Sequence, residues 1–177
     1  MKSFKQYITE LFDKPYTWKS VGKKHSREEI LNSEEMTTSY PFTHRYGFKT
    51  DDGRNFVVEI LHGMGIIDRK NTKVIHKSIA SFADESRDVT TGITGKGDAM
   101  RIFSTVTAIL LDELKEYKPE MMKFSGDKHD FRGDELGKTG RVKLYKSLMN
   151  RFAKKAGYNH TVDDYGDTVD FTLTRKK

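Results

Sequence analysis

The loop "GITGKGDA", residues 92–99, has the composition best suited to binding an anion. It leads into a helical pattern, and the first turn of a helix presents unpaired backbone N–H groups and a positive dipole end. Gly95 and Gly97 would let a phosphate approach the backbone closely, and Lys96 would add a positive charge. The simpler interpretation, which we favour, is a tight turn that requires glycine.

Asp98 argues against anion binding at this loop. An aspartate at the start of a helix accepts hydrogen bonds from the same N–H groups and repels a pyrophosphate. No Gly-Lys-Ser/Thr sequence follows the glycines at the required spacing, so the loop is not a Walker phosphate loop either. We therefore expect Asp98 to cap the helix and the wild-type loop to bind no coenzyme A.

The six histidines are the other side chains with obvious chemical potential. Neither a His-Glu-x-x-His motif nor another paired metal-ligand spacing occurs among them. The chain has no cysteine, which excludes disulfides, thiolate zinc sites and cysteine nucleophiles. We therefore expect no metal and no cofactor, and structural or solvated roles for His25, His44, His62, His76, His129 and His160.

The elements that must position these residues belong to one basic domain. A chain of 177 residues favours a single domain, and 11 Phe and 8 Tyr argue against wholesale disorder. The net charge of +6 biases the surface towards nucleic acid or acidic partners. No apolar run reaches the ~18 residues of a membrane span, so we expect a soluble protein with no membrane partner.

Three segments in the first half of the chain have the pattern of β-strands. Residues 44–50 and 54–62 flank an Asp-Asp-Gly turn, which predicts a hairpin. Residues 73–83 alternate in the same way and predict a third strand. Together these segments predict an antiparallel meander.

The second half of the chain predicts helices that alternate with strands. Apolar residues recur at helical spacing over residues 100–117, just before Pro119, and over residues 141–158, where Gly157 could form the C-cap. Shorter runs at 120–125 and 167–177 predict strands. The fold class is therefore α+β, with two main helices on a mostly antiparallel sheet.

The domain is expected to span residues 45–177, preceded by a basic, loosely structured arm at residues 11–44. Within the arm we expect one short helix over Arg27–Leu31. Ser26 could cap this helix, and Glu29 lies at the spacing of a capping box.

This order of elements resembles the GNAT acyltransferase superfamily, in which a meander leads into a Gly-x-Gly/Ala loop on the coenzyme A pyrophosphate. Gly95, Gly97 and Ala99 match that loop, and Leu144-Tyr145 with Gly157-Tyr158 looks like the family's Leu-Tyr and Gly-Phe. The chain departs from the pattern at Gly92, where the family prefers Gln or Arg, and in a longer gap between Tyr145 and Gly157.

The resemblance implies acetyl-CoA as the cofactor, bound through Gly95, Lys96, Gly97 and Ala99. It also implies Tyr145 as the general acid for the leaving thiolate and Glu59 or His62 as the base.

The first ten residues, "MKSFKQYITE", form a small basic amphipathic segment. Ten residues are too few for a stable isolated helix, so the segment either docks on the domain or folds on a partner. It closely resembles the capsid-targeting sequence of tailed-phage internal head proteins, which begins Met-Lys-Thr/Ser and ends Ile-x-Glu. That likeness implies that the prohead protease recognises Ile8, Thr9 and Glu10 and cleaves the chain after Glu10.

A second Leu-x-Glu sequence, Leu111-Asp112-Glu113, lies in the predicted long helix, where folding should shield it. The remaining domain resembles uncharacterised phage proteins with a "RIFSTV" helix and an Arg-x-x-Leu-Tyr helix, and no activity comes with that likeness.

We therefore expect an internal head protein that lies inside the virion and then enters the host cytoplasm with the genome. Its expected partners are the prohead scaffold or protease, genomic DNA bound without sequence preference, and a host protein. The alternative is a GNAT-like acyltransferase that modifies a host protein, and we favour a non-enzymatic role. The candidate DNA contacts are Lys14, Lys19, Lys23, Lys24, Arg27, Arg175, Lys176 and Lys177.

Overall fold

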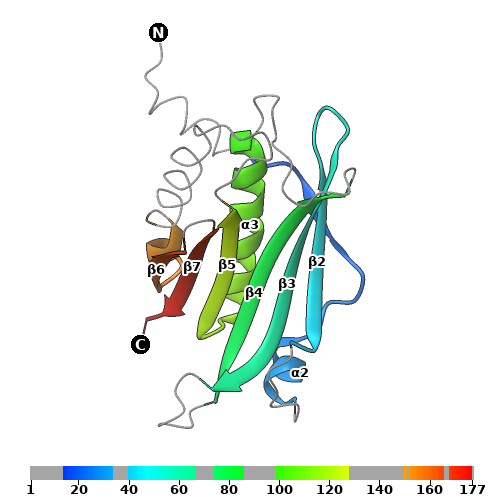
Figure 1. Cartoon of the computed structure of the whole chain (residues 1–177). Coiled ribbons are helices and arrows are strands. Elements are labelled where there is room, and N and C mark those ends of the chain that lie inside the picture. Colours follow the sequence, from blue (N-terminus) through cyan, green and yellow to red (C-terminus); the bar gives the residue numbers. More distant parts are fainter. Residues whose placement is uncertain are drawn as a thin grey trace.

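The computed structural model of the chain describes residues 14–33, 40–66, 74–85, 99–127, 150, 152–165 and 168–176. Seven strands form one sheet in the order β1-β2-β3-β4-β5-β7-β6, and helix α3 lies against one face of it (Figure 1). All neighbouring strands are antiparallel except β4 and β5. The predicted α+β class with a mostly antiparallel sheet is confirmed.

The predicted meander is confirmed as β2 (Phe42–Lys49), β3 (Asn55–Ile66) and β4 (Val74–Asp84), which pair in sequence order. The Asp-Asp-Gly turn joins β2 to β3, and Gly53 has a positive φ of 87° that a residue with a side chain rarely adopts. This turn fixes the register that places Lys49 opposite Asn55.

The region before β2 is more ordered than the sequence predicts. Strand β1 (Trp18–Val21), which was not predicted, pairs with β2 at the edge of the sheet. Helix α2 (Arg27–Leu31) is confirmed with its complete capping box between Ser26 and Glu29. The described part of residues 11–44 is therefore built into the domain and is not a loose arm.

The second half of the sheet is reached through α3 (Ala99–Tyr117), which the sequence predicts to within a residue. Strand β5 (Met121–Asp127) runs parallel to β4. Strand β7 (Thr168–Arg175) lies between β5 and β6 (Tyr158–Asp164), and β6 was not predicted. Of the predicted helix over 141–158, the structure describes residues 150 and 152–155 as helical, and Gly157 follows with a φ of 80°.

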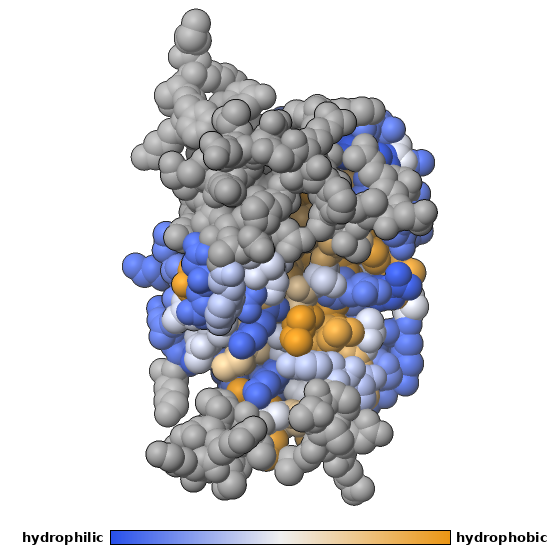
Figure 2. All heavy atoms as spheres, in the orientation of Figure 1, coloured by the Kyte–Doolittle hydropathy of each residue, from blue (hydrophilic) through white to orange (hydrophobic). Residues whose placement is uncertain are grey.

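The hydrophobic core lies between the sheet and α3. Apolar side chains of α3 such as Ile102 and Ile109 pack with Val58 and Ile60 from β3 and with Phe171 from β7. None of the helices in the described ranges combines the length and apolar character of a membrane-spanning segment. Figure 2, drawn from the side of Figure 1, shows a group of apolar side chains among hydrophilic ones on the surface.

Candidate functional site

Three histidines from consecutive strands converge on the face of the sheet that α3 covers. His44 lies opposite Ile60, and His62 lies opposite Ser78, so each histidine is diagonal to the next across a strand pair. The ring centroids of His44 and His62 are 4.6 Å apart, and those of His62 and His76 are 5.2 Å apart. None of the three is more than 1% exposed, so the cluster is a group of polar side chains buried in the core.

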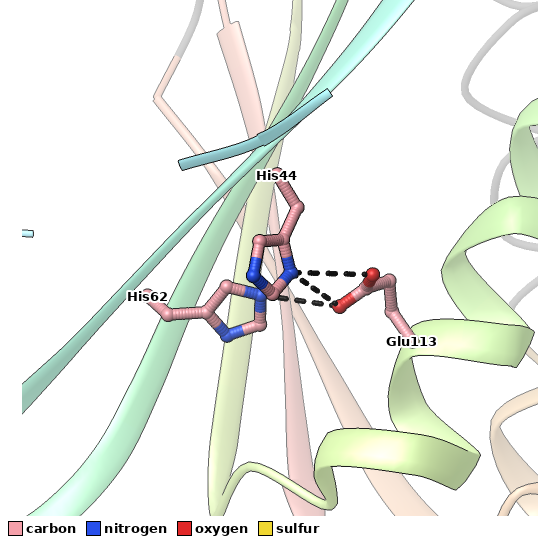
Figure 3. A group of neighbouring side chains, drawn as sticks. All are labelled: His44, His62 and Glu113. Carbon is pink, nitrogen blue, oxygen red and sulfur yellow. Dashed lines mark hydrogen bonds and ion pairs between the residues drawn. The ribbon is translucent and has the colours of Figure 1, made fainter. Parts of the chain in front are cut away.

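Helix α3 contributes Glu113 to this cluster, and the carboxylate points at the two imidazoles in Figure 3. Its Oε2 lies 3.1 Å from His62 Nε2, and His44 Nδ1 lies 3.4 Å from the carboxylate. Tyr46, from β2, donates its hydroxyl hydrogen to Oε1. Burial alone would raise the pKa of Glu113, but the hydrogen bonds from His44, His62 and Tyr46 lower it to about 2.

The hydrogen bonds assign the ring protons of two histidines. The backbone N–H of His25 donates to His44 Nε2 over 3.1 Å, so the proton of a neutral His44 lies on Nδ1 and faces Glu113. His62 donates from Nε2 to Glu113, and its Nδ1 lies 3.0 Å from Ser78 Oγ. Burial lowers the pKa of His62. A buried carboxylate is thus held by neutral donors.

His76 extends the chain of rings but is incompletely paired. Its Nε2 lies 3.0 Å from His62 Nδ1, whereas its Nδ1 is buried without a hydrogen-bond partner among the described residues. Burial is the main cause that lowers the pKa of His76 to about 3. His76 is therefore a buried neutral imidazole.

The connected side chains of Ser78, His62 and Glu113 have the order of a serine–histidine–acid triad. Ser78 is only 1% exposed, however, so no substrate carbonyl can reach its hydroxyl in this arrangement. The side chains of the cluster are also of the types that bind metal ions. Nitrogens of His44 and His62 and a carboxylate oxygen of Glu113 all lie within 4.8 Å of one another.

The two candidate bases of the acyltransferase interpretation do not share a site. His62 faces α3, whereas Glu59 lies on the opposite face of β3 and forms an ion pair with Arg45 over 2.9 Å. Ala99 is the first residue of α3. The other residues that this interpretation and the cleavage site require lie outside the described ranges: Tyr145, Gly95, Lys96, Gly97, Asp98, Ile8, Thr9 and Glu10.

Several of the candidate DNA contacts already bind acceptors of the protein. Lys24 pairs with Glu116 over 2.7 Å, and Arg175 pairs with Glu120 over 2.7 Å. Arg27 donates to the carbonyl oxygen of Tyr117. Lys23 lies 3.6 Å from Glu29, while Lys14, Lys19 and Lys176 are exposed and Lys177 lies outside the described residues.

No protein-family model, curated protein or solved structure matches this chain. Fold and site together define an α+β domain in which a mixed sheet backed by a helix encloses a buried His–Glu cluster. Function is therefore inferred from the residues and contacts of this chain alone.

Proposed function

We propose that this chain is a phage internal head protein that is carried inside the capsid and trimmed after Glu10. The observation that carries the proposal is the N-terminal decapeptide with its Ile-Thr-Glu ending. The buried core of the described residues begins at Tyr16, which packs with Phe48. Cleavage after Glu10 would therefore leave every described core residue in the protein.

Both Leu-x-Glu sequences of the chain, Leu111-Asp112-Glu113 and Leu114-Lys115-Glu116, lie inside helix α3, which supports a single trimming site. Leu111, Asp112 and Glu113 belong to α3, and Glu113 is 1% exposed and hydrogen-bonded to the sheet. A protease could bind this sequence only after the helix had opened, which also breaks the His–Glu cluster. Cleavage is therefore expected at Glu10 and not at Glu113 or Glu116 in the folded protein.

Deleting residues 2–10 is expected to abolish incorporation into phage heads while changing the melting temperature by no more than about 2 °C. The reason is that the deleted residues act as an address and the described core does not include them. Incorporation is measured by the protein content of purified heads, and stability by thermal unfolding. As a control, Glu10→Ala should enter heads but keep its N-terminus, whereas the mature wild-type protein should begin at Leu11. Normal incorporation of the deletion variant, or a loss of several kcal/mol, would contradict the proposal.

Inside the head, the protein would associate with genomic DNA through phosphate neutralisation without reading sequence. The exposed Lys14, Lys19 and Lys176 support this contact, whereas the ion pairs of Lys24 and Arg175 compete with it. After injection, the domain would act on a host protein in the host cytoplasm.

A GNAT-like acyltransferase that uses acetyl-CoA is the second candidate, and the crossover from β4 through α3 to β5 favours it. Residues Lys77–Ala80 of β4 pair in parallel with Met121–Phe124 of β5. In parallel β–α–β units, ligands bind beyond the carboxyl ends of the strands, where a helix N-terminus can hold a phosphate. The glycine loop lies between β4 and α3 in the sequence.

A cavity beside this crossover limits what the second candidate could bind. It has a volume of about 40 Å³ and is lined by apolar side chains, among them Phe82, Phe103, Val106 and Phe124. Such a volume accommodates about one water molecule.

Calorimetry with coenzyme A is expected to show no measurable binding to the wild-type protein, because Asp98 competes for the helix N-terminus and the cavity is small. Gly97→Ala is expected to lower stability rather than ligand affinity. Micromolar binding that disappears in a folded Gly97→Ala variant would instead make the acyltransferase the leading function.

A further inference from the structure

We propose that His44, His62 and Glu113 bind one divalent transition-metal ion, with zinc favoured by the ligand chemistry. Two imidazole nitrogens and one carboxylate oxygen are a common protein ligand set for zinc, which completes four-coordination with a further oxygen. The three donors come from β2, β3 and α3 and point at one another (Figure 3). This site is independent of the proposed phage function.

Two of the three separations between the ligand atoms are close to those of a tetrahedral site, and all three atoms lie within 4.8 Å of one another. Two ligands bound to zinc at 2.0–2.2 Å lie about 3.3–3.6 Å apart at the tetrahedral angle. The carboxylate of Glu113 is 3.1 Å from His62 Nε2 and 3.4 Å from His44 Nδ1. Shifts of a few tenths of an ångström would therefore convert these hydrogen bonds into metal bonds.

The charge of the cluster also favours a cation. Glu113 is 1% exposed, and its hydrogen-bond partners are the imidazoles of His44 and His62 and the hydroxyl of Tyr46. A buried charge is normally paired with an opposite charge or bound to a metal ion. A divalent cation between His44, His62 and Glu113 would neutralise the carboxylate and join α3 to two strands.

The groups behind His62 fit its role as a ligand. A metal-bound histidine donates its other ring N–H to a nearby acceptor. When the metal replaces the proton on Nε2, His62 carries its ring proton on Nδ1, which lies 3.0 Å from both His76 Nε2 and Ser78 Oγ. His76 is therefore a positioning residue for His62 in the metal-bound state.

The hydrogen bond between His44 and the backbone of His25 must rearrange when the metal binds. His44 Nε2 accepts the N–H of His25, so Nδ1 carries the proton that the metal would replace. When His44 binds the metal through Nδ1, its ring proton lies on Nε2. Nε2 can then no longer accept the hydrogen bond from the backbone N–H of His25. His25 lies between β1 and α2, outside both elements, and its carbonyl oxygen accepts the hydroxyl hydrogen of Tyr117. Metal binding should therefore change the environment of the His25 amide.

The ion would reach the cluster from the surface groove that Tyr46 lines. The hydroxyl of Tyr46 bonds to Glu113, and the same residue lines this groove with Trp18, Lys24 and Glu116. A water molecule beside Tyr46 would supply the fourth ligand.

The test uses the full-length protein, stripped with a chelator and titrated with Co²⁺ or Zn²⁺. We expect one ion per chain at micromolar protein, intense visible absorption typical of tetrahedral cobalt, and a melting temperature raised by several degrees at saturating zinc. In NMR spectra the His25 amide signal should shift. His44→Gln and His62→Gln should each weaken binding by at least about 100-fold, and His76→Gln by about 10- to 100-fold.

The matched control is His160→Gln, which removes a histidine of β6 outside the cluster and should leave affinity unchanged. The proposal is overturned if the stripped wild-type protein binds no stoichiometric cobalt or zinc. It is equally overturned if folded His44→Gln and His62→Gln bind as tightly as the wild type. Should these variants not fold, the cobalt spectrum and the His25 shift of the wild type decide.

Discussion

Replacing Glu113 with alanine is expected to lower the free energy of unfolding by about 3–5 kcal/mol. The carboxylate accepts hydrogen bonds from His44, His62 and Tyr46, all of which are buried. Alanine would leave these donors without their acceptor and open a cavity between α3 and the sheet. Urea denaturation of the chelator-treated protein measures the loss.

The matched control is Glu116→Ala, one turn along the same helix. Glu116 is exposed and pairs with Lys24 at the surface, so its loss should change stability by less than about 1 kcal/mol. Glu113→Gln keeps one acceptor oxygen and should fall between the two. A Glu113→Ala variant as stable as Glu116→Ala would show that the cluster does not stabilise the fold.

Acid is expected to destabilise the metal-free protein from about pH 6.5 downwards, well before ordinary carboxylates protonate. The pKa of His76 falls from 6.5 to about 3 in the folded protein, so the unfolded chain binds more protons throughout that interval. Stability is then lost as the pH falls, with a slope of up to about 1.4 kcal/mol per pH unit for this residue. The lowered pKa of His62 acts in the same direction.

Glu113 adds a second step at lower pH. Its pKa is 4.5 in the unfolded chain and about 2 in the folded protein, so its contribution is complete above pH 4.5 and disappears as the pH falls towards 2. Denaturant titrations at half-unit pH intervals measure both steps. In His76→Gln the slope between pH 6.5 and 4.5 should become smaller, whereas His160→Gln should match the wild type. A free energy of unfolding that is constant from pH 7 to 5 would rule out the first step.

The elements that sequence reasoning predicts correctly are those with local signals. The Asp-Asp-Gly turn, the spacing of apolar residues in α3 and the Ser26–Glu29 capping box each act over a few residues. Strands β1 and β6 lack such signals, because they are edge strands whose residues are mostly exposed. They are strands because β2 and β7 offer them backbone partners, and that depends on the tertiary fold.

The His–Glu cluster was missed for a related reason. Its members lie 14 to 69 positions apart in pairwise contacts, so no motif spacing connects them. One signal was available. The predicted hairpin register puts His44 and His62 on the same face of the sheet, and strand alternation places His76 there as well. Only the position of Glu113 over these strands needs the packing of α3.

Strand β1 carries the chain's single tryptophan, so the intrinsic fluorescence of the protein reports on this strand. Trp18 is half-buried against the core and lines the groove beside Tyr46, so its emission responds to the docking of the edge strand. Circular dichroism, by contrast, averages over the entire sheet and the helices. Fluorescence therefore distinguishes fraying of the N-terminal edge from global unfolding in every variant described above, without any added label.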